Sequence, residues 1–135
     1  MKYVVDASVA VEYLLRTTIG RNAADILDEA DLMAPELLDV EVLSILRRGV
    51  LKRELAVERA SLALEDLMAW PIDRISHRQL VGEAWQFRHN ISAYDAIYVA
   101  TARLFQATLL TADGPLSRAP IGDVVIRNLR TQFPA

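Results

Sequence analysis

The sequence predicts an α/β protein with three layers, in which helices flank both faces of a central, mainly parallel β-sheet. Short apolar runs rich in β-branched residues alternate along the chain with longer segments whose apolar residues recur at helical spacing. Short apolar strands of this kind are typical of parallel strands that are buried on both faces. Because strands joined by helices form parallel βαβ units, the helices are expected on both sides of the sheet.

The first part of the chain predicts two strands and three helices. Residues 2–5 form a β-rich run that leads directly into a helix with apolar residues on one face. Gly20 and Asn22 are expected to interrupt the chain before a second helix. Pro35 suits the first position of a third helix, and Gly49 is expected to stop it. The predicted elements are a strand at 2–5, helices at 7–16 and 23–30, a strand at 32–34 and a helix from 35 to about 48.

The remaining sequence continues the alternation. Pro71 ends a long helix, Ser92 is placed to cap another, and residues 113–115, Asp-Gly-Pro, predict a turn. Neither a linker nor a repeat divides the sequence, so we expect a single domain over residues 1–135. The predicted elements are helices at 55–70, 76–88 and 92–105, and strands at 72–75, 108–111 and 124–126.

Composition restricts the class of protein. A chain of 135 residues that is 53% hydrophobic can bury the core of one compact domain. No apolar run approaches the ~20 residues of a membrane span, and the start of the chain lacks a signal-peptide pattern, so we expect no membrane partner. The absence of cysteine excludes cysteine-bound zinc and fits a cytoplasmic protein. With only two histidines, a metal site would need oxygen ligands, which suggests Mg²⁺ or Mn²⁺.

The charge distribution leaves a nucleic-acid partner open. The net charge of −3 argues against one, but 15 residues are basic and all except Lys2 and Lys52 are arginines. Arg47 and Arg48 lie close in sequence to Lys52 and Arg53. Guanidinium groups suit phosphate recognition, whereas solvated helix faces are the alternative explanation for the cluster.

Four acidic residues, Asp6, Glu41, Asp95 and Asp113, interrupt or end apolar stretches. Asp6 and Asp113 follow two predicted strands, and the carboxyl ends of parallel strands meet at the edge of the sheet where ligands bind. An unpaired carboxylate is costly to remove from water, and most of these acids have no basic residue nearby in sequence. A shared divalent metal ion is therefore the simplest explanation.

Three of the acids also have a structural explanation. Asp6 could cap the helix that begins at residue 7. Asp95 could complete a capping box with Ser92, and Asp113 could be an ordinary turn aspartate. Each of these explanations is reasonable alone.

Glu41 is harder to explain in this way. Its neighbours three and four residues away are mostly apolar, so a solvated glutamate is not expected there. Its structural alternative is a buried ion pair with Arg48. Because all four explanations would have to hold together, the acids favour a common metal site.

The four acids lie in segments that match a known family in order and spacing. These segments are Val4-Val5-Asp6-Ala7-Ser8, Leu37-Leu38-Asp39-Val40-Glu41-Val42, Tyr94-Asp95-Ala96-Ile97-Tyr98-Val99-Ala100-Thr101-Ala102 and Leu109-Leu110-Thr111-Ala112-Asp113. With them the chain resembles the PIN-domain family, and within it the VapC-type ribonuclease toxins of type II, VapBC-type toxin–antitoxin systems. The similarity covers essentially the whole chain.

The resemblance implies a three-layer α/β/α PIN-like fold and an endoribonuclease that depends on Mg²⁺ or Mn²⁺. It implies that Asp6, Glu41, Asp95 and Asp113 are both the catalytic and the metal-binding residues, with Asp6 and Asp95 as direct ligands. Ser8 would be an accessory hydroxyl that could orient a water molecule, or a second capping residue. The resemblance also implies a cognate VapB-like antitoxin, homodimers and toxin–antitoxin hetero-oligomers. The sequence leaves the number of metal ions, one or two, open.

The mechanism that this resemblance implies is hydrolysis of RNA by water. Cleavage would then leave 5′-phosphate and 3′-hydroxyl ends. Arg47, Arg48 and Arg118 are the candidates for contacts with RNA phosphates or with acidic groups of an antitoxin. Tyr94 and Tyr98 could stack on bases or belong to the core.

Two alternatives stay open at this point. A catalytically silent PIN-like interaction module would use the acids only to cap helices and close turns. A phosphatase-like or receiver-like α/β domain could share the sheet. The phosphatase would need a second aspartate where Ser8 stands, and the receiver would need an acidic pair and a late lysine that the sequence lacks.

Overall fold

The computed structural model describes residues 1–119 and 121–132, and its centre is a parallel sheet of five strands. The strand order is β3-β2-β1-β4-β5, so the first strand of the chain is the central one. All four neighbouring pairs run parallel. The strands are β1 (Lys2–Val5), β2 (Asp31–Pro35), β3 (Asp73–Ile75), β4 (Thr108–Thr111) and β5 (Ile126–Asn128).

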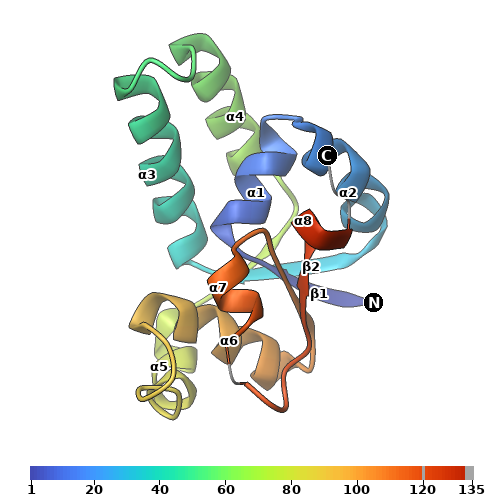
Figure 1. Ribbon diagram of the computed structural model, residues 1–135, viewed down its shortest axis with the longest axis vertical. Coiled ribbons are helices and arrows are strands. Elements are labelled where there is room, and N and C mark those ends of the chain that lie inside the picture. The colour runs from blue at the N-terminus through green and yellow to red at the C-terminus, as the bar shows by residue number, and fades with distance from the viewer. Residues whose placement is uncertain (120, 133–135) are drawn as a thin grey trace.

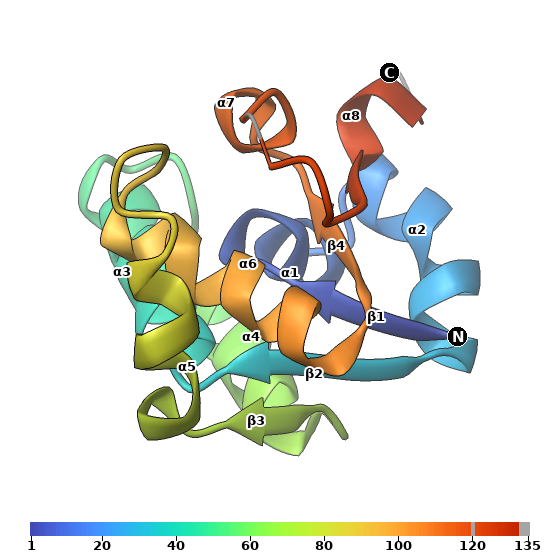
Figure 2. The same ribbon diagram turned by 90° about the horizontal axis from the view of Figure 1, so that it is seen from below.

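Helices cover both faces of this sheet. The helices α1 to α4 pack on one another in one layer, and α5 packs on α6 in the other. Figure 1 shows the first layer above the strands and the second below them, and Figure 2 shows the same arrangement from below. The helices are α1 (Ala7–Leu14), α2 (Thr18–Glu29), α3 (Leu37–Leu51), α4 (Val57–Ala69), α5 (His77–Trp85), α6 (Ala93–Phe105), α7 (Gly114–Ser117) and α8 (Leu129–Gln132).

The two central strands form the middle of the core. Val4 of β1 pairs with Leu109 of β4, and Val5 pairs with Leu110. All four side chains are completely buried. Since strands covered on both faces have no solvated side, apolar residues at consecutive positions are what this place in the fold requires. The three-layer α/β fold and the mainly parallel sheet predicted from the sequence are therefore confirmed.

The structure corrects two predicted interruptions. α2 begins at Thr18, not at residue 23, because Thr17 caps it by accepting a hydrogen bond from the Gly20 amide. Gly20 is needed for close packing: a Cβ atom there would lie 2.0 Å from the carbonyl oxygen of Glu12. Gly49 does not stop α3, which continues to Leu51.

Three further differences lie in the last part of the chain. The predicted turn at residues 113–115 is the start of the short helix α7. The last strand is β5 at Ile126–Asn128, not 124–126, and α8 was not predicted. The expectation of a single domain over 1–135 includes Pro120 and residues 133–135, which lie outside the described residues, and it stays a prediction. In the part of the chain that is described, no helix has the length and apolarity to cross a membrane.

Candidate active site

The carboxyl ends of the central strands bring distant acids to one edge of the sheet. Asp6 directly follows β1, and its amide donates a hydrogen bond of 3.2 Å to the Leu110 carbonyl of β4. Asp113 follows β4, so it leaves the sheet at the same edge. Asp95 lies in the first turn of α6, which packs against β1, β2 and β4. Glu41 lies in α3, which packs against α1 and β2.

Asp6 is held by three hydrogen-bond donors. It is the N-cap of α1, and its Oδ1 accepts from the Val9 amide at 3.0 Å and from the Ser8 hydroxyl at 2.6 Å. Its Oδ2 accepts from the Thr111 hydroxyl at 2.5 Å. The capping role considered for Asp6 is thus confirmed. Because a carboxylate oxygen has two lone pairs, Oδ2 keeps one for a further partner.

Two hydroxyls tie Asp6 to the segment that follows β4. Ser8 Oγ accepts from the Ala112 amide at 2.8 Å, and Thr111 Oγ1 accepts from the Asp113 amide at 2.9 Å. Thr111 is fully buried, and the sequence analysis did not include it among the site residues. A hydroxyl residue that ends an apolar strand two positions before an acid is the signal that could have found it.

Tyr98 is the partner of Glu41. Its hydroxyl donates a hydrogen bond of 2.6 Å to Glu41 Oε1, and the Tyr98 side chain is only 2% exposed. Burial and the adjacent Glu41 charge raise the pKa of Tyr98, so the phenol stays protonated and keeps donating. No ion pair between Glu41 and Arg48 occurs among the described residues, so that alternative is wrong. Tyr98 belongs to the core, whereas Tyr94 is 63% exposed.

Asp95 and Asp113 are more accessible than Asp6. The Asp95 amide donates to Ser92 Oγ at 3.2 Å, which is half of the capping box considered from the sequence. Asp113 is the N-cap residue of α7, but its carboxylate makes no capping hydrogen bond. Burial raises the pKa of Asp95, and the charges of Asp113 and Glu41 raise it further. Asp95 is thus close enough to two other acids to be repelled by them.

Electrostatics at this edge are unbalanced. Burial raises the pKa of Asp6 to about 6; the hydrogen bonds from Ser8, Thr111 and Val9 oppose this, and the Asp113 charge adds to it. None of the ion pairs in the described ranges involves Asp6, Glu41, Asp95 or Asp113. Carboxylates that repel one another and lack a basic partner are the oxygen donors that a hard divalent cation prefers.

The acids do not stand at metal-binding separations. Within residues 1–119 and 121–132, no three acidic or histidine side chains are close enough together to hold one metal ion as they stand. Their carboxylate oxygens are nevertheless hard donors of the kind that Mg²⁺ or Mn²⁺ prefers, and Glu41, Asp95 and Asp113 are only partly buried.

Arg118, one of the three candidate arginines, lies close to a residue next to Asp113. A Cβ atom on Gly114 would lie 2.7 Å from Arg118 Nη1, so the guanidinium lies against the residue that follows Asp113. Arg47 and Arg48 are exposed on α3 beyond Glu41. The structure thus places one arginine beside the site and two along the helix that carries Glu41.

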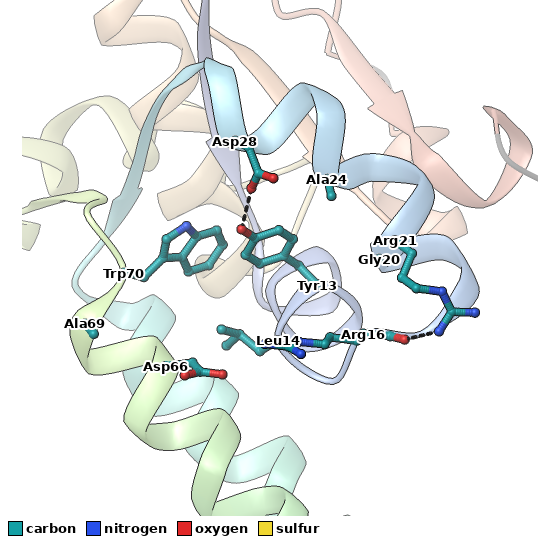
Figure 3. A pocket seen from close by; sticks show the side chains of 10 residues that line it. All are labelled: Tyr13, Leu14, Arg16, Gly20, Arg21, Ala24, Asp28, Asp66, Ala69 and Trp70. Atoms are coloured by element: carbon teal, nitrogen blue, oxygen red, sulfur yellow. Dashed lines mark hydrogen bonds between the residues drawn. The ribbon is translucent and has the colours of Figure 1, made fainter.

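A separate pocket of about 380 Å³ lies at the other end of α1, between α1, α2 and α4. Its centre is Tyr13, whose ring stacks on Trp70 at 4.9 Å between centroids and whose hydroxyl donates to Asp28 at 2.6 Å (Figure 3). Arg21 closes one side by donating to the Arg16 carbonyl at 2.6 Å. None of the four site acids lines this pocket.

Comparisons with known proteins agree on one family. The model of the family described as PIN domain matches residues 3–122. Ribonuclease VapC1 of Mycobacterium tuberculosis is 42% identical over 123 residues, which cover 87% of this chain and 90% of that protein. Ribonuclease VapC3 of the same organism is 38% identical over 117 residues, or 86% and 85% of the two chains.

Solved structures share the fold at lower identity. A protein from Pyrobaculum aerophilum superposes with a TM-score of 0.65 at 20% identity and covers 98% of this chain and 93% of its own. VapBC2 from Rickettsia felis, solved with a DNA fragment from its promoter, gives a TM-score of 0.58 at 19% identity, with 95% and 98% covered. These similarities support the three-layer arrangement described above.

Proposed function

Since this chain belongs to the PIN-domain family, we propose that it is a VapC-type endoribonuclease, the toxin of a toxin–antitoxin pair. The observation that carries the proposal is that Asp6, Glu41, Asp95 and Asp113 lie near enough to one another at this edge of the sheet to interact electrostatically, and none is in an ion pair in the described residues. Relatives named as VapC ribonucleases, at 42% and 38% identity over most of the chain, support the same activity.

We propose that the acids hold Mg²⁺ or Mn²⁺. Asp6 would offer the free lone pair of Oδ2, and Glu41, Asp95 and Asp113 would offer carboxylate oxygens to the same place. Such an ion, when bound, supplies positive charge that polarises a phosphate and favours ionisation of water. With the ion absent, the acids would repel the RNA backbone as they repel one another, so cleavage should depend on the cation.

The other residues of the site position the acids. Ser8 and Thr111 fix both oxygens of Asp6, so its free lone pair keeps one direction. Tyr98 holds Glu41 by one oxygen. Arg118, which lies beside Asp113, could bind a phosphate next to the cut and offset the acidic rim.

The finer parts of the proposal follow from this chemistry and family. Because the attacking group would be water and not the ribose 2′-hydroxyl, the products would carry 5′-phosphate and 3′-hydroxyl ends. A VapB-like antitoxin, a homodimer, a hetero-oligomer with the antitoxin and a cytoplasmic location are expected for a protein of this type. A toxin–antitoxin complex from Klebsiella pneumoniae shares the fold, at 16% identity and a TM-score of 0.62.

The direct test is cleavage of end-labelled single-stranded RNA by the purified protein. We expect no cutting in the presence of a chelator, restoration by Mn²⁺ or Mg²⁺, and loss of cutting in Asp6→Asn. Mapping the ends of the products identifies the nucleophile. Cutting in chelator, products with 2′,3′-cyclic phosphates, or an Asp6→Asn variant as active as the wild type would each contradict the proposal.

A catalytically silent interaction module is the second candidate. It is favoured by the separation of the acids, since no three of them stand at metal-binding distance in the described residues, and by the capping hydrogen bonds at Asp6 and Ser92. Equilibrium titration with Mn²⁺ separates the two functions. The nuclease should bind Mn²⁺ at millimolar or lower concentration and lose binding in Asp95→Asn, whereas the silent module should bind none.

A further inference from the structure

Two neighbouring arginines of α3 face different sides of the helix. α3 packs against both α1 and α4, which also contact each other. Arg48 lines a groove together with Leu15, which follows α1, and with Lys52. Arg47 lines a smaller hollow of about 190 Å³ together with Ala60 of α4. The two residues have the same side chain and are both exposed, but only Arg48 faces the α1 side.

The α1 side of α3 also carries Glu41. Arg48 follows Glu41 by seven residues and Lys52 follows it by eleven, so at 100° per residue both lie within about 20° of its direction. At 1.5 Å per residue, Arg48 lies about 10 Å and Lys52 about 16 Å further along the helix. The three side chains therefore form one line from the acids to the end of α3.

α1 borders the same line. Asp6 caps the start of α1, and both α1 and α3 run upward from the edge of the sheet in Figure 1. Near the far end of both helices lies a hollow of about 320 Å³, which we call the α1–α3 groove. It is lined by Leu15, Ile45, Arg48, Gly49, Lys52, Glu54 and Leu55. Glu41 lies about 10 Å before Arg48 on the same side of α3.

The α1–α3 groove suits a polyanion with an apolar component. In the described ranges, neither Arg48 nor Lys52 makes an ion pair or a side-chain hydrogen bond, so both charges are available. Ile45 and Leu55 give the groove an apolar lining. Glu54 also lines it, so two cations face one acid.

We propose that the α1–α3 groove binds the stretch of single-stranded RNA next to the cleavage site, with Arg48 and Lys52 on its phosphates and a base or ribose against the apolar lining. The proposal deepens the proposed function and rests on it, because the acids, about 10 Å away along α3 at Glu41, must be the place of cutting. A phosphodiester chain carries the same anion at every nucleotide, so one strand can reach both the acid-bound cation and the two basic residues.

The test is the salt dependence of RNA binding in an Asp6→Asn background, where no cutting is expected. Binding of a fluorescein-labelled single-stranded RNA is followed by anisotropy between about 50 and 200 mM salt. Each phosphate contact to a single strand contributes about 0.7 to the slope of log K against log salt concentration. We expect Arg48→Ala to lower the slope by about 0.7 and Arg48→Ala/Lys52→Ala by about 1.4, with affinity falling several-fold at each step.

Arg47→Ala is the matched control, because it removes the same charge one residue away and should leave the slope unchanged. Arg48→Lys should keep the slope, and Glu54→Gln should tighten binding. Circular dichroism melting checks that each variant is folded. Equal slopes for Arg47→Ala and Arg48→Ala would overturn the proposal. Binding of an oligoglutamate peptide tests an acidic protein partner in place of RNA. If Arg48→Ala loses binding to this peptide but keeps RNA binding, the proposal is also overturned.

Failure of the proposed function gives a different pattern. If the protein without the Asp6 substitution does not cut RNA with Mn²⁺, the nuclease assignment fails. The slopes still report whether the groove binds RNA. If cutting occurs but the slope is the same for every variant, the nuclease assignment stands and the groove proposal fails.

Discussion

The two ends of α1 use the same hydrogen bond in opposite surroundings. At the start of α1, Asp6 accepts a hydrogen bond from the Thr111 hydroxyl at 2.5 Å. In the last turn of α1, the Tyr13 hydroxyl donates a hydrogen bond to Asp28 at 2.6 Å. Burial and Asp28 raise the pKa of Tyr13 to about 12, so this pair carries a single negative charge. At the Asp6 end, Asp113 adds a second negative charge, and Glu41 and Asp95 add more.

The difference shows what distinguishes a reactive site from a pocket in this protein. The pocket beside Tyr13 is well formed, but its rings are stacked on each other and its Asp28 carboxylate accepts a hydrogen bond from Tyr13. The Asp6 end has an excess of negative charge and no basic partner in the described residues. Charge imbalance, and not the volume of a hollow, is therefore the property that points to chemistry here. The following experiments test this contrast.

The largest effect is expected for cleavage of RNA. Asp6→Asn and Asp95→Asn should lower kcat/KM by roughly 10³-fold or more, because each removes a negative oxygen ligand from the proposed cation site. Asp28→Asn is the matched control at the other end of α1 and should stay within about twofold of the wild type. Similar losses in Asp28→Asn and Asp6→Asn would show that both ends of α1 matter only for folding.

Ionisation of Asp6 is expected to lower the unfolding free energy by up to about 3 kcal/mol as pH rises from about 4 to about 6. The pKa of Asp6 is raised from 3.8 to about 6 in the folded protein, so folding favours the protonated acid. The stability that this contributes is present below pH 4 and is lost as pH rises through 6. The gain in unfolding free energy from Asp6→Asn should therefore grow between pH 4 and 7.

Denaturant unfolding in the presence of a chelator measures this difference. Adding Mn²⁺ at pH 7.5 should stabilise the wild type more than Asp6→Asn, because the bound cation would favour the ionised acid. A difference between the two proteins that does not change with pH would contradict the raised pKa of Asp6.

A backbone change can weaken the pocket end alone. Gly20→Ala should cost about 2 to 3 kcal/mol of unfolding free energy, because its Cβ would meet the Glu12 carbonyl at 2.0 Å. Gly82→Ala in α5 has open space around its Cβ and should stabilise the protein by up to about 1 kcal/mol. Thermal melting measures both. Below its melting temperature, Gly20→Ala should still cut RNA at nearly the wild-type rate.

The smallest effects are expected when the hydroxyl of Tyr98 or of Tyr13 is removed. Tyr98→Phe removes the hydrogen bond to Glu41 and should weaken Mn²⁺ binding about tenfold, as expected when a residue that orients a metal ligand is lost. Tyr13→Phe removes the hydrogen bond to Asp28 and should cost about 1 kcal/mol of stability without changing Mn²⁺ binding. Calorimetric titration and melting of both variants check the contrast. Equal Mn²⁺ affinities in both variants would assign Tyr98 a purely structural role.

The sequence predicted the sheet well because its strands carry a clear pattern. β1 and β4 were placed at their observed bounds, since a strand buried on both faces needs consecutive apolar residues. The start of α2 and the end of α3 were predicted wrongly, because a glycine was taken as a helix break in each case. Gly20 and Gly49 were expected to break helices, but each lies inside one. There the missing side chain allows close packing against Glu12 of the preceding helix and against Leu55 of the following loop, respectively.

The site was predicted in part. Asp6 and Asp113 were expected at one edge because parallel strands end together, and the structure places them there. The partners were not predictable in the same way. Thr111 meets Asp6 across 105 positions and Tyr98 meets Glu41 across 57, and no local spacing encodes such contacts. The separate directions of Arg47 and Arg48 likewise depend on which helices pack beside α3.

The position of β1 at the centre of the sheet has a consequence for protein synthesis. β1 is synthesised before its neighbour β4, and the Thr111 hydroxyl that holds Asp6 is made more than a hundred residues after Asp6 itself. A nascent chain that has not reached β4 thus lacks one of the two neighbours of its central strand and the last of its four acids. The four acids can therefore come together only after β4 and Asp113 have been synthesised.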